Sequence, residues 1–459
     1  MTAVAKGPDG PVLDGAGLVL GIGVTGTAVA RALVRRGHEV ILVDDRPGPE
    51  AMAVAVELGL DLEEAPGADR LAELISRVAG VLPSPGIPDH HRVFQAAAAA
   101  GVPVIGELDL AAAWDDRPCL AITGTDGKTT VTTLVTAMLG ASGIRAVDAG
   151  NTDVPLVAAI DDPTIEVFVV EASSFRLAPL RRFHPRVGTW LNFAPDHLDC
   201  HGTLARYEAA KAGLWARLTA GDLAVANADD PVVMGHAMAT PRRQTFGIGP
   251  RGLDGSRPDW HVAAAALRAP DGETIVAIDD LHRRLPHDLG NGLAATATAV
   301  AGGASLDGVR AALGSFRGLP HRVMLVGEAE GVRWFDDSKA TAPHATLAAV
   351  SGFDSVVLIA GGRNKGLDLG ALAEASVRVR AVVAIGDAAA EVAAAFAGHR
   401  PVETATSMDD AVARAHALAR PGDAVLLSPG CASFDWYRSY GERGDDFVRA
   451  VRAEIGAQS

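Results

Sequence analysis

Residues 119–139 have the sequence CLAITGTDGKTTVTTLVTAML, and this stretch decides the fold class of its surroundings. An apolar run leads into a loop rich in glycine and threonine, and a helical pattern follows. A strand, a tight loop and a helix in this order are typical of an α/β fold with a mostly parallel sheet. Similar alternations of strand and helix patterns occur on both sides of this stretch.

The loop itself, residues 124–130, favours phosphate binding. Backbone N–H groups of such a loop can cradle phosphates, while Lys128 supplies a positive charge and Thr129 can hold Mg²⁺. The match to the common phosphate-loop pattern is incomplete, because that pattern requires glycine at the position of Ile122. The alternative is a glycine-rich turn with a surface lysine. The preceding strand, the following helix and the two threonines favour phosphate binding over that alternative.

A second glycine loop, Gly21-Ile22-Gly23-Val24-Thr25-Gly26, follows the apolar run GLVL near the N-terminus. Asp44 and Asp45 end the next predicted strand, about twenty residues further on. Glycines allow a phosphate to approach the backbone at the N-terminus of a helix. Taken alone, this motif fits a dinucleotide-binding oxidoreductase and a tight turn that binds nothing equally well.

Polar residues also follow other predicted strands. Glu171 ends the run VFVV, and the segment 195–199, PDHLD, follows RVGTWLNF. Ligands of open α/β sheets bind at the carboxyl ends of strands, so Glu171 is a candidate magnesium ligand. His197 lies between two aspartates and is a candidate ligand of a second metal ion, with a purely structural histidine as the alternative.

The C-terminal third carries two clusters at predicted strand ends, DDSKAT at 336–341 and GGRNKG at 361–366. Each could be a solvated charged loop. Together they predict a site of cations and hydroxyls for a substrate that bears a carboxylate. The pattern also predicts a short strand in GVPVIGE, at 101–107, and a small antiparallel appendage at 250–290.

Composition narrows the classes of protein. A chain of 459 residues suits two to four domains. The net charge of −15 disfavours nucleic acid and anionic lipid as partners. Three widely spaced cysteines argue against a disulfide framework or a zinc site and favour a reducing cytoplasm. The sequence has no signal-peptide core and no apolar run of about 18 residues, so we expect no membrane insertion.

Seven motifs together resemble those of the Mur ligase family in order and spacing. The resemblance covers residues 15–456 and rests on GTDGKTT, EASSFRL, NFAPDHLD, YEAAK, GLPHR, DDSKAT and LLSPGCASFD. It is strongest to the branch that joins D-glutamate to UDP-N-acetylmuramoyl-L-alanine through an acyl phosphate, and DDSKAT with LSPGCAS is its most specific part.

The resemblance implies an α/β protein of three domains. It implies a Rossmann-like, UDP-sugar-binding domain at 1–113, a central ATP-binding domain with a mostly parallel sheet at 114–318, and a Rossmann-like, amino-acid-binding domain at 319–459. It also implies a cytoplasmic monomer that acts on small molecules, with ATP and two Mg²⁺ ions, which Mn²⁺ can replace. The first glycine loop is thereby assigned to uridine diphosphate.

The resemblance also assigns roles to single residues. It implies catalytic roles for Lys128, Lys211, His197 and Lys339. It implies that ATP is bound by Gly124, Thr125, Asp126, Gly127, Lys128, Thr129, Thr130, Asn291, Arg322 and Asp337. The implied metal ligands are Thr129, Glu171, His197 and Lys211, the last as a carbamate. Without the resemblance, Lys211 fits an ordinary lysine on a helix surface.

Two further ligand sets follow from the same resemblance. The UDP-sugar is assigned to Gly23, Val24, Thr25, Asp44, Ser84, Pro85, Gly86, Asn151 and Ser173. D-Glutamate is assigned to Lys339, Thr341, Lys365, Ser433, Phe434 and Tyr440. The chain departs from the family pattern at Asp126, Arg176, Thr152-Asp153 and Arg363-Asn364. Two competing hypotheses remain. One is a relative that adds L-glutamate or acts on another UDP-muramoyl peptide, and the other is a nucleotide-sugar or dinucleotide-binding sensor without catalysis.

Overall fold

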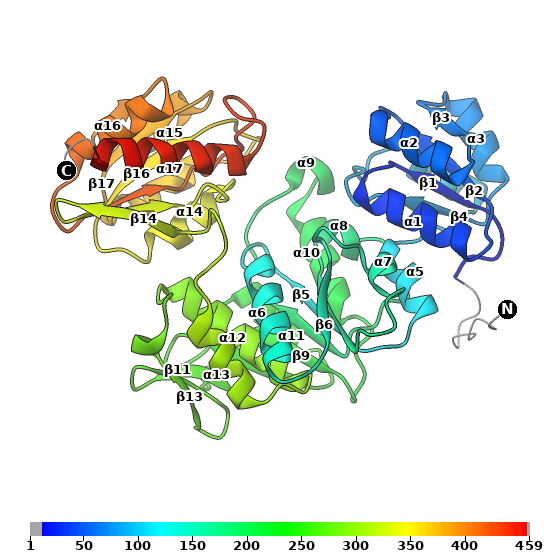
Figure 1. Cartoon of the computed structure of the whole chain (residues 1–459), viewed down its shortest axis with the longest axis horizontal. Helices are drawn as coiled ribbons and strands as arrows, with labels where there is room; N and C mark the ends of the chain where they lie inside the picture. The colour runs from blue at the N-terminus through cyan, green and yellow to red at the C-terminus, as the bar shows by residue number, and fades with distance from the viewer. Residues whose placement is uncertain (1–11, 457–459) are drawn as a thin grey trace. The chain divides into compact units, whose positions relative to one another are not determined.

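The computed structural model describes residues 12–456 (Figure 1). By their internal contacts these residues form two compact units. The first unit comprises residues 12–193, Cys200–Leu281 and Gly290–Ser315 and contains two β-sheets. The second comprises Ala194–Asp199, His282–Leu289 and residues 316–456 and contains a third sheet. The α/β class with parallel-rich sheets is therefore confirmed.

The first sheet has four parallel strands in the order β3-β2-β1-β4, which are Leu62–Glu64, Val40–Asp44, Gly17–Leu20 and Gly80–Pro83. Successive residues of β1 face opposite sides, so Val19 packs in one core cluster and Leu18 and Leu20 in another. The surrounding helices are α1 (Val24–Arg35), α2 (Pro49–Leu58), α3 (Ala68–Ser76) and α4 (Arg92–Ala100). The predicted strand at 101–107 is wrong, because only Val104 forms a bridge, to Val81.

The second sheet has nine strands in the order β13-β12-β11-β10-β9-β8-β5-β7-β6. The strands from β11 to β6 are parallel: Trp260–Ala263, Arg243–Gly247, Leu223–Asn227, Val187–Trp190, Cys119–Thr123, Val167–Glu171 and Ala146–Gly150. At the edge, β12 (Ala266–Arg268) and β13 (Thr274–Ala277) run antiparallel. The antiparallel prediction for 250–290 is thus confirmed, as a continuation of this sheet.

Helices and two short 3₁₀ turns accompany this sheet. They are α5 (Glu107–Trp114), α6 (Lys128–Ala141), α7 (Leu156–Ala159), α8 (Ser174–Leu177), α9 (Leu198–His201), α10 (Leu204–Ala212), η1 (Gly213–Trp215), α11 (Pro231–Ala237), η2 (Ile278–Asp280), α12 (Pro286–Ala301) and α13 (Leu306–Ser315). One hydrophobic cluster extends from α1 and α2 to β5, β7 and β8. The two sheets of the first unit therefore share a core.

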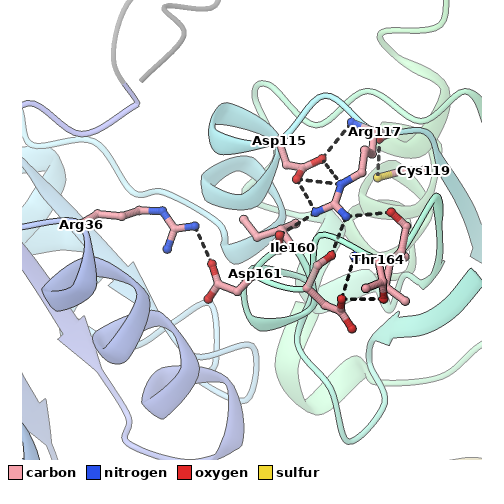
Figure 2. A network of polar contacts seen from close by, with 9 residues as sticks. Arg36, Asp115, Arg117, Cys119, Ile160, Asp161 and Thr164 are labelled. Atoms are coloured by element: carbon pink, nitrogen blue, oxygen red, sulfur yellow. Dashed lines mark hydrogen bonds and ion pairs between the residues drawn. The ribbon is translucent and has the colours of Figure 1, made fainter. Parts of the chain in front are cut away.

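Arg117, between α5 and β5, fixes the segment after α7 by polar contacts (Figure 2). Its guanidinium donates to Asp115 and to the carbonyls of Ile160, Asp162 and Ile165, at 2.6 to 2.8 Å for the three carbonyls. Close by, Arg36, which directly follows α1, donates to Asp161 at 2.8 Å. The segment after α7 is thereby bound to the end of α1 and to the loop before β5.

The third sheet has the order β14-β15-β19-β16-β17-β18. Its strands are Met324–Ala329, Val332–Asp336, Ala424–Leu427, Val356–Gly361, Val379–Ile385 and Val402–Thr404, and only β14 pairs antiparallel. Its helices are α14 (Pro343–Val350), η3 (Leu369–Val377), α15 (Ala389–Phe396), α16 (Met408–Leu418) and α17 (Tyr440–Gly456). Two core clusters, one on each face, contain alternate residues of β16.

Candidate functional site

The loop between β5 and α6 is held in place by backbone conformation and by one asparagine. Gly124 and Gly127 have φ angles of +158° and +83°, which side-chain-bearing residues rarely adopt. Asn192, which follows β8, accepts hydrogen bonds through Oδ1 from the amides of Thr125 (2.9 Å) and Asp126 (2.8 Å). The loop therefore has a fixed shape at the carboxyl ends of neighbouring strands.

Two lysine ammonium groups converge on the carbonyl of Gly124. Lys128, the first residue of α6, donates to this carbonyl at 2.9 Å and to that of Thr125 at 2.7 Å. Lys211 of α10 donates to the same Gly124 carbonyl at 2.7 Å. The Lys211 side chain is only 1% exposed, and its Nζ lies 4.5 Å from the ring centre of Tyr207. The interpretation of Lys211 as a surface lysine is therefore wrong, and two cations lie beside the loop.

Glu171 lies at the carboxyl end of β7, next to the loop strand β5, where it is opposite Ile122. Its Oε1 accepts a hydrogen bond of 2.9 Å from Asn151. Its Oε2 is buried and has no hydrogen-bond partner among the described residues. An unsatisfied buried carboxylate oxygen costs free energy, and a cation would satisfy it. Glu171 therefore fits a Mg²⁺ ligand, and that role stays a prediction. Asn151, a predicted UDP-sugar residue, contacts Glu171 directly.

His197 belongs to the second unit, with the segment Ala194–Asp199. Its backbone has a φ of +52°, and its side chain is 39% exposed, with Nε2 3.4 Å from Asp196. Within residues 12–456, no three His, Cys, Asp or Glu side chains form a cluster that could hold a metal ion. The role of His197 as a metal ligand stays a prediction.

The other residues predicted to bind ATP fall into two groups, one at the loop between β5 and α6 and one in the second unit. A Cβ atom on Gly127 would lie 2.5 Å from Oδ1 of Asn291, so this asparagine of α12 packs against the loop. Thr129 and Thr130 occupy the first turn of α6. Arg322 and Asp337 belong to the second unit, where Asp337 accepts a hydrogen bond of 2.7 Å from Ser428.

The first glycine loop is built differently. The Ile22 amide donates to the Asp44 carboxylate at 2.7 Å, and the Ser84 hydroxyl donates to the Gly21 carbonyl at 2.6 Å. A Cβ atom on Gly26 would lie 1.9 Å from the Gly21 carbonyl oxygen, so only glycine fits there. The structure thus brings Asp44 and Ser84, two residues predicted to bind the UDP-sugar, together at this loop.

A buried ion pair lies next to this loop. Arg176 of α8 donates to Glu107 at 2.6 Å and to the Thr25 hydroxyl at 2.9 Å. Burial raises the pKa of Glu107, although the charge of Arg176 opposes that shift. Glu107 and Arg176 also line a pocket of about 370 Å³ together with Ser84 and Pro85, two of the predicted UDP-sugar residues. Arg176, where the chain departs from the family pattern, is therefore paired with a buried carboxylate, that of Glu107.

In the second unit, the DDSKAT segment follows β15 and faces the start of α17. The Lys339 ammonium lies 5.0 Å from the ring centre of Tyr440, and the Ser338 hydroxyl donates to the Tyr440 carbonyl at 2.8 Å. Lys365 and Phe434 are exposed, Thr341 is half-buried and Ser433 is buried. The structure therefore pairs Lys339 with Tyr440, two of the residues predicted to hold D-glutamate.

Three residues that shape these sites were missed by the sequence interpretation. Asn192 and Tyr207 lie inside NFAPDHLD and YEAAK, so the motifs were the available signal. Tyr207 contacts the loop through a 3.3 Å hydrogen bond to the Thr125 hydroxyl. Glu107 gives no local signal, because its partner Arg176 is 69 residues away.

Comparisons with known proteins agree with this geometry. The sequence matches family models described as Mur ligase MurD-like, N-terminal domain (residues 16–106), Mur ligase middle domain (122–277) and Mur ligase, glutamate ligase domain (321–431). A Frankia casuarinae protein named UDP-N-acetylmuramoylalanine–D-glutamate ligase is 45% identical, with 96% of this chain and 94% of that protein covered. A Desulfosudis oleivorans protein of the same name is 40% identical, with 95% of each covered.

Solved structures support the same fold. A pseudomurein peptide ligase type C from Methanothermus fervidus superposes with a TM-score of 0.59 and 17% sequence identity. The similarity covers 96% of this chain and 100% of that one. At this level of identity, the similarity concerns the fold alone.

Proposed function

Because the chain belongs to the Mur ligase family, we propose that it is an ATP-dependent ligase that joins D-glutamate to UDP-N-acetylmuramoyl-L-alanine in peptidoglycan precursor synthesis. The names of the two relatives described above support this substrate pair. The competing sensor hypothesis has no support in those names.

The observation that carries the proposal is the Lys128 ammonium, which donates to the carbonyls of Gly124 and Thr125 in the loop after β5. ATP and a substrate carboxylate are both anions, and they repel each other at bonding distance. Cations held beside a rigid loop reduce that repulsion and stabilise the charge that moves during phosphoryl transfer. A loop whose amides are already oriented by Asn192 provides this without reorganisation.

The reaction proceeds in two steps. A carboxylate oxygen of the alanyl group attacks the γ-phosphorus of ATP, ADP leaves, and an acyl phosphate forms. The D-glutamate nitrogen, after loss of a proton from its ammonium, attacks the acyl carbon. The tetrahedral intermediate then expels inorganic phosphate and leaves an amide. Lys128 stays beside the phosphates throughout and binds the transferred group more strongly as charge accumulates on it.

We assign Mg²⁺ binding to Thr129, Glu171, His197 and a carbamylated Lys211, and the buried Glu171 Oε2 supports this assignment. Bound Mg²⁺, or Mn²⁺ in its place, would neutralise phosphate charge and orient the reacting oxygens. The Glu171 carboxylate, the Lys211 carbamate and the Thr129 hydroxyl offer oxygen atoms, which magnesium prefers, and His197 would add a nitrogen ligand.

The two other substrates are assigned to separate regions. The UDP-sugar is placed at the first glycine loop and Ser84, within a domain proposed to end near residue 113. D-Glutamate is placed at Lys339 and Tyr440, in a domain proposed to begin near residue 319, with the central domain between them. The enzyme is proposed to act as a cytoplasmic monomer. Among residues 12–456, none of the helices is both long and apolar enough to cross a membrane.

A screen of amino acids against UDP-N-acetylmuramoyl-L-alanine, with ADP release as the readout, tests the function. We expect release that depends on ATP, on the UDP-sugar and on D-glutamate together. A faster reaction with L-glutamate would identify the enzyme as a relative with the other stereochemical preference. Ligand binding without ADP release under any amino acid would favour the sensor and contradict the proposal.

The metal assignment of His197 has its own test. Replacement of a ligand in a metal site weakens metal affinity, so His197→Ala should raise the Mg²⁺ concentration needed for half-maximal rate by about tenfold or more. A structural histidine would instead lower the unfolding temperature and leave the metal requirement unchanged. Titration of the rate with Mg²⁺, alongside thermal unfolding of both proteins, separates these two outcomes.

A further inference from the structure

Arg443, in the first turn of α17, is a buried cation that none of the assignments above uses. Its side chain is among the largest fully buried ones, with 1% of the residue exposed. Its hydrogen-bond acceptors are neutral oxygens: the Ser338 hydroxyl (2.9 Å), the Ser338 carbonyl (2.8 Å) and the Cys431 carbonyl (3.1 Å). A buried guanidinium usually bonds a carboxylate, because its desolvation is costly. The arrangement therefore calls for an explanation other than ion pairing.

The acceptors of Arg443 belong to two loops that also carry predicted substrate contacts. Ser338 directly precedes Lys339, in the loop after β15, and Cys431 lies two residues before Ser433, in the loop after β19. One planar guanidinium thus binds both loops at once. Its rigid fork of donors fixes their separation, which a flexible lysine could not do equally well.

A second contact fixes the same region. A Cβ atom on Gly444 would lie 2.1 Å from Nδ1 of His321, so α17 passes very close to this histidine. The same Nδ1 lies 2.7 Å from the Asp336 carboxylate, two residues before Ser338. The start of α17 therefore packs against the DDSKAT loop through two adjacent residues, Arg443 and Gly444.

We propose that Arg443 is a positioning residue, which holds the Lys339 loop and the Ser433 loop at the separation that the amino-acid substrate requires. The inference rests on the proposed function, since those loops are the assigned D-glutamate site. Burial lowers the pKa of Arg443 to about 10, so the side chain stays charged at neutral pH. The carboxylates of Asp435 and Asp336 interact with this charge, so its role is to fix the two loops rather than to attract the substrate.

The test compares Arg443→Lys with Arg449→Lys, an exposed arginine on the same helix. Steady-state kinetics gives KM for each of the three substrates, and thermal unfolding reports the fold. We expect Arg443→Lys to raise KM for D-glutamate at least tenfold and to lower kcat/KM for it by on the order of 10²-fold, as small displacements of positioning groups do. KM for ATP and for the UDP-sugar should change less than about twofold by the same argument, and Arg449→Lys should match the wild type.

Two outcomes would overturn the inference. One is an unchanged KM for D-glutamate in a folded Arg443→Lys protein. The other is an equal loss for all three substrates that follows the loss of folded protein. If Arg443→Lys does not fold, Ser338→Ala removes one acceptor and keeps the cation, and the same selective rise in KM for D-glutamate is expected. A wild-type enzyme without D-glutamate-dependent ADP release would overturn the proposed function itself, which distinguishes the two failures.

Discussion

The two glycine loops of the first unit share a local pattern and differ in chemistry. In each, a glycine directly follows the strand, and a helix begins directly after another glycine, Gly23 in one loop and Gly127 in the other. The first helical residue is Val24 in the N-terminal loop and Lys128 in the central loop. Val24 is 65% exposed, whereas Lys128 is folded over its own loop.

The surroundings of the two loops differ as well. An amide of the first loop donates to the carboxylate of Asp44, and amides of the second donate to the neutral oxygen of Asn192. Asp44 brings a charged acceptor, which suits the hydroxyl groups of a ligand, to the first loop, whereas Asn192 brings no charge to the second. The second loop also has the buried ammonium of Lys211. Glycine spacing therefore fixes the backbone path, and side chains from neighbouring elements decide which ligand suits the loop.

The largest expected effect is that of Lys128→Ala. Removal of this charge from the central loop should lower turnover by about 10²-fold or more, while the UDP-sugar still binds. The measurement is ADP release under saturating substrates, with UDP-sugar binding followed by calorimetry. At the equivalent position of the first loop, Val24→Ala removes no charge and should have a much smaller effect on turnover. Near-normal ADP release from Lys128→Ala would contradict the phosphate-loop assignment.

The next effect concerns Lys211. Lys211→Ala removes the second cation at Gly124, or the anion that a carbamate would supply, and should also lower turnover strongly. If the carbamate is present, short carboxylic acids should restore part of the rate, because they can occupy the vacated space. Arg206→Ala, at an exposed position of the same helix, is the matched control. If Lys211→Ala turned over as fast as Arg206→Ala, the carbamate assignment would be contradicted.

An intermediate effect separates two glycines of the first loop. Gly26→Ala places a Cβ atom 1.9 Å from the Gly21 carbonyl oxygen, so the backbone must move. Overpacking of this kind costs about 1–3 kcal/mol of unfolding free energy. Gly23→Ala meets no atom within 4 Å and should change stability by less than about 0.5 kcal/mol. Chemical denaturation of the two variants measures this difference, and equal stabilities would show that the loop can rearrange.

The smallest effect is expected from Asp44→Asn. The amide oxygen of asparagine can still accept the hydrogen bond from Ile22, so the unfolding free energy should change by about 1 kcal/mol or less. KM for the UDP-sugar should rise modestly, since one negative acceptor becomes neutral. A loss of stability as large as that of Gly26→Ala would mean that the loop depends on the charge of Asp44 and not only on its shape.

Much of the fold could be predicted from the sequence, because strand and helix periodicities are local. The apolar runs GLVL, CLAIT and VFVVE each became a buried strand, and the glycine loops formed where the runs end. The run GVPVIGE failed because Glu107 and the residues after it form α5, which leaves a single bridge at Val104. The resemblance of the motifs assigned Lys211 to the metal site. The helical pattern around it indicated only a lysine on a helix surface.

Local sequence patterns and motifs were enough to establish the α/β class, the positions of the glycine loops and the family to which the chain belongs. Which side chains surround each loop became known from the packing of the folded chain. The strand order places β5 between β7 and β8, which brings Glu171 and Asn192 to the two sides of the same loop. Neither this order nor the burial of Arg443 follows from local patterns. Both depend on packing between segments far apart in the chain, where buried polar groups must find partners that no sequence window contains.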